Sequence, residues 1–305
     1  MPDKLQPSIP QNQHGLYFHY VGLTDTGMVR DHNEDAFKIP LDIDEETLQL
    51  KGHLYVLADG MGGHQKGEVA SEVTIRMVSQ EYYTAVKQLS DDEVADSLVN
   101  LLGQSIMTAN EEVMDATEGG GTTVVAALLH GEALICMNVG DSRAYLLRDD
   151  TMSLISKDHS LVSRLVEMGK ITEEQALTHP RRNVLYQALG QGSDVEIFDY
   201  QTKLKLNDII ILCSDGLWGE VPDRIIEQVL AQSKTPLESA EDLITLANQA
   251  GGNDNITAII IEVCDSPVDS PYQPIEDGAY PPSAARLMPK PDTLPEGDHY
   301  VDQNE

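Results

Sequence analysis

Residues 122–147 read TTVVAALLHGEALICMNVGDSRAYLL and contain three short runs of aliphatic and β-branched residues separated by turn residues. Such runs are typical of buried β-strands. The His130-Gly131 turn between the first two runs leaves no room for a crossover helix. Because parallel neighbours need a connection of a dozen or more residues, this spacing favours an antiparallel meander. We therefore expect antiparallel sheets at the centre of the fold.

The rest of the chain combines further strand-like runs with long helical patterns. Apolar periodicity predicts helices over 67–87, 91–117, 160–169, 222–232 and 236–250. Strands are expected over 16–23, 54–58, 122–129, 133–139, 144–147, 195–202, 209–213 and 255–263. The first two helices are consecutive, as are the last two, and strands are concentrated between them. This order indicates an α+β fold, an αββα sandwich of two mainly antiparallel sheets flanked by helix pairs.

The composition restricts the classes of partner. The chain has 305 residues with 20 Lys and Arg against 51 Asp and Glu, which gives a formal net charge of −31. This length is enough for one large domain with a substantial core. The acidity argues against nucleic acid, whose phosphates are bound by basic grooves, and against docking on an anionic membrane. Two explanations stay open: a solubilising surface, or carboxylates that converge on a cation.

The cysteines and the apolar runs indicate the compartment. Cys136, Cys213 and Cys264 each stand in an apolar stretch, and no CxxC pair occurs. A disulfide framework and a zinc–thiolate site are therefore not expected. The first residues lack the apolar segment of a secretory signal, and no apolar run approaches the ~20 residues that span a bilayer. We expect a reduced, cytoplasmic protein without a membrane segment.

One domain is expected over residues 15–264, between two terminal segments of different composition. Residues 1–14 look like a flexible leader. Residues 265–305 hold eight of the 15 prolines and nine acidic residues against two basic ones. Because such a segment buries too little apolar surface to offset its ordering entropy, we expect an acidic disordered tail. Nothing in the sequence indicates a coiled coil or a large exposed apolar face, so we expect a monomer.

Four aspartates stand at the edges of strongly apolar strands: Asp59, Asp141, Asp215 and Asp254. An Asp-Gly pair by itself is ordinary turn chemistry. Four carboxylates gathered at sheet edges, however, would repel one another unless a cation held them. Oxygen ligands without His or Cys partners select Mg²⁺ or Mn²⁺. Since glycine lets the backbone approach an ion closely, the Gly60 carbonyl is a further candidate ligand.

A charged cluster, RDHNED at residues 30–35, follows the first expected strand. As part of a site, it would provide Arg30 as a bidentate clamp for a phosphoryl group and Glu34 or Asp35 as an outer metal contact. As part of the surface, it would be a solvated charged turn. No GxxxxGK[ST] motif occurs, so a P-loop is not expected to hold phosphate.

These stretches together carry a resemblance to a known family. The ordered set RDHNEDAF, LADGMGGHQKGEVAS, GTTVVAALL, NVGDSRAYLL, IILCSDGLWGEV and GGNDNITAIII resembles the metal-dependent PPM (protein phosphatase 2C-like) serine/threonine phosphatases. The GMGGH form is similar to their bacterial branch. The set spans roughly residues 16–263, and its order is highly specific. The resemblance implies an αββα sandwich with two Mn²⁺ or Mg²⁺ ions in a cleft at one end of the sheets.

The resemblance also implies roles for individual residues. Asp59 would bridge the two metals, and the Gly60 carbonyl would bind one of them. Asp215 and Asp254 would hold the other metal, while Glu34 would act through the water shell.

Two further positions match the family's pattern, and one departs from it. Asp141 matches a ligand of a third, weaker metal, and Arg30 matches the phosphate-binding arginine. Some relatives carry a His directly after the Asp-Gly turn as the acid for the leaving alcohol. Here that position is Met61, and His64 lies three residues further on. His64 and metal-bound water are therefore both candidates for the general acid.

Residues 157–190 fall where the family has its variable flap beside the cleft. Arg181 and Arg182 within this segment are candidate contacts for a phosphorylated substrate, or ordinary surface charge. His159 is expected to be a surface or core histidine rather than a ligand. Trp218 is expected to be a packing anchor for the neighbouring Asp-Gly turn.

These features predict metal-dependent hydrolysis of phosphoserine and phosphothreonine on proteins. Two metals would lower the pKa of a bridging water, which attacks phosphorus in line without a phosphoenzyme intermediate. The substrates would be phosphorylated proteins, the products of a Ser/Thr kinase. Two alternatives stay open: a two-metal phosphohydrolase of small phosphate esters, and a weakly active module that binds phosphoproteins.

Overall fold

The meander expected over residues 122–147 forms, but its third strand leaves the sheet of the first two. Strands β5 (Val124–His130) and β6 (Ala133–Val139) pair with each other. Strand β7 (Arg143–Arg148) belongs to a second sheet. The chain changes sheets just after Gly140, whose φ of 104° lies in the region that favours glycine. The next residue, Asp141, therefore lies where the chain passes between the sheets.

The computed structural model describes residues 15–41, 43–62, 65–233 and 235–266. All of them belong to one unit by their internal contacts. The expected leader 1–14, the candidate acid His64 and residues 267–305 of the expected tail lie outside the described residues.

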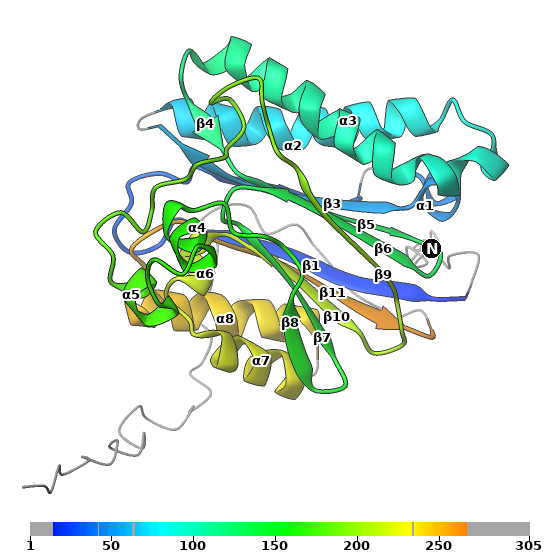
Figure 1. Cartoon of the computed structure of the whole chain (residues 1–305). Coiled ribbons are helices and arrows are strands. Elements are labelled where there is room, and N and C mark those ends of the chain that lie inside the picture. Colours follow the sequence, from blue (N-terminus) through cyan, green and yellow to red (C-terminus); the bar gives the residue numbers. More distant parts are fainter. Residues whose placement is uncertain (1–14, 42, 63–64, 234, 267–305) are drawn as a thin grey trace, which may run out of the picture. The chain divides into compact units, whose positions relative to one another are not determined.

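Two antiparallel sheets form the centre of the described fold (Figure 1). The first sheet contains, in spatial order, β1 (Tyr17–Asp25), β11 (Ile256–Cys264), β10 (Ile209–Cys213), β7 and β8 (Thr151–Leu154). The second contains β2 (Asp35–Lys38), β3 (His53–Met61), β5, β6 and β9 (Phe198–Lys203), with β4 (Gly121–Thr122) paired to β3. The antiparallel pairing that the short turns predicted is confirmed.

Helix pairs cover the outer face of each sheet (Figure 1). The helices over the second sheet are α2 (Gln65–Val86) and α3 (Asp91–Thr117). Those over the first sheet are α7 (Asp223–Gln232) and α8 (Pro236–Ala250). The shorter helices are α1 (Glu45–Lys51), α4 (Leu161–Glu167), α5 (Glu173–Leu177) and α6 (Asp215–Trp218). The predicted αββα order of layers is confirmed.

Strands β3 and β5 are buried on both faces, because alternate side chains enter different core clusters. Val56 and Ala126 pack in the cluster that includes the apolar residues of α2 and α3. Leu57 and Val125 pack in the cluster between the sheets, where they meet side chains such as Ile259. The central strands therefore read as continuous apolar runs, and their ends are the first places where polar groups appear.

The sequence prediction missed the shortest elements. Strand β2 reads DAFK, which is too short and too polar to stand out from the charged cluster before it. Asp215 opens the single-turn helix α6 rather than a simple turn. The strand expected over 195–202 begins only at Phe198. Within the described residues, no helix is long and apolar enough to cross a membrane.

His53 at the start of β3 makes the stability of the fold depend on pH. Its buried ring meets Phe18 edge-on at 4.9 Å between centroids. Burial, with a smaller contribution from His130, lowers the pKa of His53 from 6.5 to about 4, although a backbone hydrogen bond at Leu129 opposes the shift. Between these two pH values the unfolded chain binds a proton that the folded chain does not. The folded state therefore loses stability as the pH falls through this window.

We expect the free energy of unfolding of the wild type to fall relative to that of His53→Leu by about 3 kcal/mol between pH 7 and pH 4. Urea unfolding of both proteins across this range measures the difference. The other acid-sensitive groups are common to both proteins and cancel. Parallel stability curves would show that His53 takes up its proton equally in both states.

Candidate metal centre

Asp35 in β2 joins the two sheets near the candidate site. Its carboxylate accepts hydrogen bonds from the hydroxyls of Ser214 at 2.8 Å and Thr257 at 2.6 Å. Burial raises the pKa of Asp35 to about 8, and these two hydrogen bonds oppose the shift. Ser214 immediately precedes Asp215, and Thr257 lies three residues after Asp254. The two bonds therefore fix, across the sandwich, the segments that carry two of the predicted ligands.

Asn255 holds the charged loop between β1 and β2. Its side-chain amide donates to the backbone carbonyls of Thr26 at 2.9 Å and His32 at 3.0 Å. Its Oδ1 accepts a hydrogen bond from the backbone N–H of Glu34 at 2.8 Å. The Asn255 side chain is buried, so these partners replace water. The charged loop is thereby attached to the residue that follows Asp254.

Two glycines allow backbone segments to pack together at the site. A Cβ atom on Gly60 would lie 2.2 Å from the carbonyl oxygen of Gly67 and 2.6 Å from that of Glu34. A Cβ atom on Gly216 would lie 2.0 Å from the carbonyl oxygen of Asn255. Since no side chain fits at these distances, both Asp-Gly pairs need glycine for the close approach of the backbone.

Thr123 connects the turn of Asp59 with the turn of Asp141. Its backbone N–H donates to the Asp59 carbonyl at 2.9 Å, and its hydroxyl accepts from the Asp59 N–H at 3.1 Å. The same hydroxyl lies 2.6 Å from the hydroxyl of Ser142. The end of β3 and the crossing between the sheets are therefore tied at one point.

The predicted carboxylates come together at this point. Asp141 is buried, whereas Asp59 and Asp215 are partly exposed. Burial is the main cause that raises the pKa of all three above the ordinary range, to about 6 for Asp215. Nearby negative charges raise these pKa values further: Asp35, Asp141, Asp215 and Asp254 act on Asp59. The four aspartates singled out by the sequence are therefore neighbours in space.

Arg30 forms an ion pair with one of these carboxylates. Its Nη2 lies 2.6 Å from Oδ2 of Asp254, while 46% of its side chain stays exposed. Burial lowers the pKa of Arg30, but the charges of Asp254, Glu34 and Asp215 outweigh it and raise the pKa overall. The guanidinium therefore stands beside the carboxylates with an open face toward solvent.

The donor chemistry of this group fits a hard divalent cation. Its side-chain donors are carboxylate oxygens, a set that suits Mn²⁺ or Mg²⁺. Neighbouring carboxylates of like charge are costly to bury together, and a cation removes that cost. Within the described residues, no three His, Cys, Asp or Glu side chains stand close enough together to hold a metal ion by themselves. Because Mg²⁺ usually keeps several waters, such a site does not need a complete shell of side chains.

Two residues that were expected to be structural support the turns of the site. His159 is a buried residue whose Nδ1 accepts a hydrogen bond from the N–H of Gly140 at 3.2 Å. The backbone N–H of His159 donates to the Gly140 carbonyl at 3.0 Å. The ring of Trp218 lies 3.6 Å from the guanidinium carbon of Arg143. The contacts of His159 hold the segment that follows β6, and the contact of Trp218 holds helix α6.

The flap arginines are not part of this group in the structure. Arg181 and Arg182 are exposed, and their backbone N–H groups donate to the ring and the carbonyl of His179. Among the described residues, no ion pair connects either guanidinium with the carboxylates above. Met61, the last residue of β3, has no titratable group and is therefore not a proton donor.

The sequence analysis missed Asn255, Ser214 and Thr257. Each is a polar residue beside or within a strongly apolar strand, in the stretches IIILCSD and NDNITAIII. Since buried polar groups need partners, this placement was the available signal. The identity of the partners was not available from local sequence, because they lie far away in the chain.

Comparison with known proteins identifies the family of the chain. The family model for Protein phosphatase 2C matches residues 20–182. The serine/threonine phosphatase Stp of Listeria innocua is 38% identical over 242 residues, which cover 78% of this chain and 93% of that protein. The serine/threonine protein phosphatase PstP of Mycobacterium tuberculosis is 38% identical over 273 residues, covering 87% of this chain and 48% of PstP. The match thus spans about half of PstP.

Among solved structures, the catalytic domain of PstP in complex with two manganese ions is similar, with a TM-score of 0.68 and 34% identity. The match covers 82% of this chain and 99% of that one. The antiparallel sandwich and these relatives together define a metal-dependent phosphatase. The chain belongs to the protein phosphatase 2C family and is a serine/threonine protein phosphatase of the bacterial type. Phosphorylated proteins are its substrates.

Asn255→Ala removes three hydrogen bonds to the charged loop and is expected to lower the free energy of unfolding by about 2–4 kcal/mol. The activity of the folded fraction is expected to fall, because the loop that carries Arg30 loses its attachment. Urea unfolding and phosphatase assays measure the two effects.

The matched control is Asn253→Ala, two residues away, where the side chain donates to Glu220 at an exposed position. This change is expected to cost under about 1 kcal/mol and to leave activity intact. Equal effects of the two substitutions on stability and activity would show that Asn255 does not hold the charged loop at the site.

Proposed function

We propose that Asp59, Asp215 and Asp254, together with the Gly60 carbonyl, bind two Mn²⁺ or Mg²⁺ ions, and that Arg30 binds the phosphoryl group. The observation that carries this assignment is the convergence of the three carboxylates beside the guanidinium. Asp59 is the proposed bridging ligand, because the negative charges of the other carboxylates all act on it. This assignment is also the one that the family resemblance implies.

When bound, the ions supply an activated water as nucleophile and neutralise charge on the phosphoryl oxygens. Arg30 orients the phosphoryl group, since its planar guanidinium matches two oxygens at once. Asp254 keeps Arg30 in place through their ion pair. Glu34 acts outside the first ligand shell, where its backbone is fixed by Asn255. His64 and metal-bound water are the two proposed donors of the proton to the leaving alcohol.

Asp141 is proposed to contribute to a third, weaker metal site. The support for this assignment is electrostatic. Burial is the largest cause that raises the pKa of Asp141, and the negative charges of Asp215 and Asp158 raise it further. Arg181 and Arg182 are proposed to contact substrate from the flap, since both are exposed cations in that segment.

We further infer the cellular setting from the same features. Residues 15–264 carry the activity, and residues 1–14 and 265–305 lie outside the phosphatase domain. The enzyme acts as a monomer in the cytoplasm on proteins phosphorylated by a Ser/Thr kinase, without nucleic acid or membrane partners. The net charge of −31 supports the exclusion of those polyanions.

Release of phosphate from a phosphothreonine peptide tests the assignment. The wild type is expected to turn over with Mn²⁺ and to stop when a chelator is added. Asp254→Ala is expected to lose about 100-fold in activity, since it removes a ligand and the partner of Arg30. Arg30→Ala is expected to raise KM roughly tenfold, and Arg30→Lys is expected to restore part of that loss.

Two outcomes would contradict the proposal. The first is a folded wild type that releases no phosphate with Mn²⁺, and the second is full activity of Asp254→Ala. Thermal unfolding of each variant, measured beside the assay, separates loss of the site from loss of the fold.

A further inference from the structure

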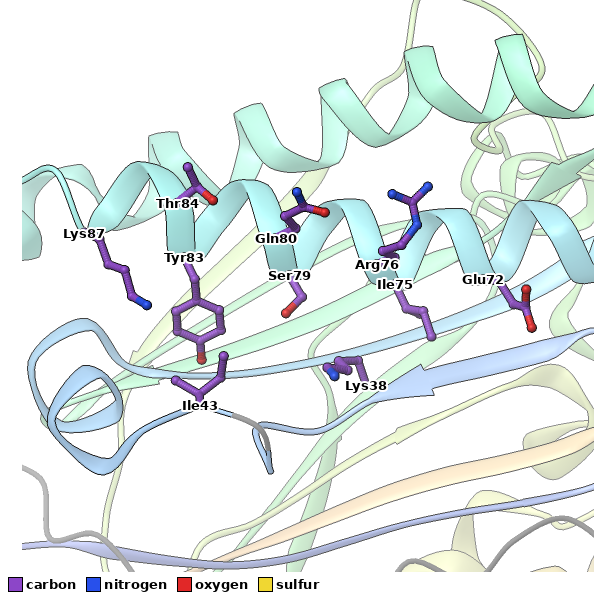
Figure 2. A pocket seen from close by; sticks show the side chains of 10 residues that line it. All are labelled: Lys38, Ile43, Glu72, Ile75, Arg76, Ser79, Gln80, Tyr83, Thr84 and Lys87. Carbon is purple, nitrogen blue, oxygen red and sulfur yellow. The ribbon is translucent and has the colours of Figure 1, made fainter.

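A groove of about 570 Å³ runs between α2 and the chain that follows β2 (Figure 2). None of its lining residues belongs to the carboxylate centre. Figure 2 shows Ile75, Ser79 and Tyr83 pointing from α2 toward Ile43 and Lys38. The inner surface of the groove is therefore largely apolar and is built from two segments distant in the sequence.

Tyr83 is fixed in this wall. Its hydroxyl donates to the Gly52 carbonyl at 3.1 Å and accepts from the N–H of Leu54 at 3.1 Å. With its polar atom satisfied and only 5% of the residue exposed, Tyr83 is a rigid part of the core at the base of the groove. Ser79, Gln80 and Thr84 line the same groove and carry groups that can hydrogen-bond a peptide backbone.

Cations surround the apolar surface. The lining contains Lys38, Arg76 and Lys87 against one acidic residue, Glu72. Asp44 lies close enough for the charge of Lys87 to contribute to the lowering of its pKa, although its own hydrogen bonds with Thr47 contribute more. With Asp44 counted, three cations stand against two carboxylates, so the groove has a small positive excess in a chain with a net charge of −31. Its chemistry is complementary to a ligand that is both acidic and partly apolar.

The groove begins next to the metal centre. The hydroxyl of Ser71 donates to the backbone carbonyl of Glu34 at 2.6 Å, and Glu72 is the next residue of α2. From Glu72 to Lys87 the helical rise gives a length of about 22 Å, which matches about seven residues of extended chain. The charged loop and the near end of the groove are therefore neighbours along α2.

We propose that this groove docks an extended, acidic segment with apolar residues on the phosphoprotein substrate, a few residues away from the phosphorylated position. The identity of the partner as substrate rests on the proposed function, whereas the binding chemistry of the groove does not. Acidic side chains meet Lys38, Arg76 and Lys87, and apolar side chains meet the half-buried Ile43 and Ile75. Substrates with such a segment are selected over those without it.

Binding is tested with a dye-labelled, unphosphorylated peptide of seven residues, Glu-Leu-Glu-Asp-Leu-Glu-Glu, by fluorescence anisotropy on the full chain. The double variant Arg76→Glu/Lys87→Glu is expected to weaken binding at least about fivefold. It is expected to bind instead the peptide with Lys at every acidic position. The matched control is Lys203→Glu/Arg224→Glu, which makes the same change of charge at exposed positions outside the groove. This control is expected to bind like the wild type.

Turnover tests the same groove with a second readout. A short phosphothreonine peptide is compared with the same peptide carrying the acidic segment, attached on either side through a three-residue spacer. For the wild type, the segment is expected to lower KM about fivefold at constant kcat. In Arg76→Glu/Lys87→Glu this advantage is expected to vanish, while the KM of the short peptide stays unchanged.

Three results would overturn the proposal: no binding of the peptide by the wild type, an equal loss in the control variant, or equal binding after both Leu residues are replaced by Ser. The last two would show an effect of general charge. If the wild type does not turn over the short peptide, the proposed function fails, and the anisotropy measurement still decides whether the groove binds.

Discussion

Asp59, Asp141 and Asp215 lie together at one end of two packed sheets, where burial and mutual repulsion raise the pKa of each. The surrounding chain prevents these groups from moving apart. Hydrogen bonds from Ser214 and Thr257 to Asp35 connect the sheets. Other contacts fix the backbone. Asn255 binds the backbone of Glu34 in the charged loop, and the backbone packs so closely at Gly60 and Gly216 that no side chain fits there. Because the scaffold maintains a cluster of like charge, a divalent cation is its natural counter-charge, and Arg30 supplies only part of it.

Much of the fold could be predicted from the sequence, because short turns and consecutive helices restrict how buried strands combine. The move of β7 into the other sheet could not, since alternation shows which faces are buried but not which strands pair. The aspartates were visible as polar residues that end apolar runs. The support of Asp35 by Ser214 and Thr257 was not, because these partners lie 179 and 222 residues away in the chain. Local patterns carry no information about such contacts.

The net negative charge of the chain affects how a phosphorylated substrate is bound. Most of the −31 belongs to the surface and to the acidic terminal segment, and it keeps polyanions away at long range. A phosphorylated substrate must therefore be attracted locally. In the proposed assignments, Arg30 provides positive charge at the site itself, and the cations along α2 provide it beside the site. Helix α2 thus connects the two regions that are proposed to contact the phosphorylated substrate. Its first turns pack against the charged loop, and the groove with its positively charged residues runs along the rest of its length.

Equilibrium unfolding in urea at increasing Mn²⁺ tests most directly whether a cation balances the buried carboxylates. We predict that the free energy of unfolding of the wild type rises by about 1.4 kcal/mol per tenfold increase in Mn²⁺ for each ion bound, above its dissociation constant. With a chelator present, Asp59→Asn is predicted to be more stable than the wild type, because one charge of the repelling group is gone, and its response to Mn²⁺ is predicted to be lost or reduced. A wild type whose stability is independent of Mn²⁺, or an Asp59→Asn variant with the full response, would contradict this account.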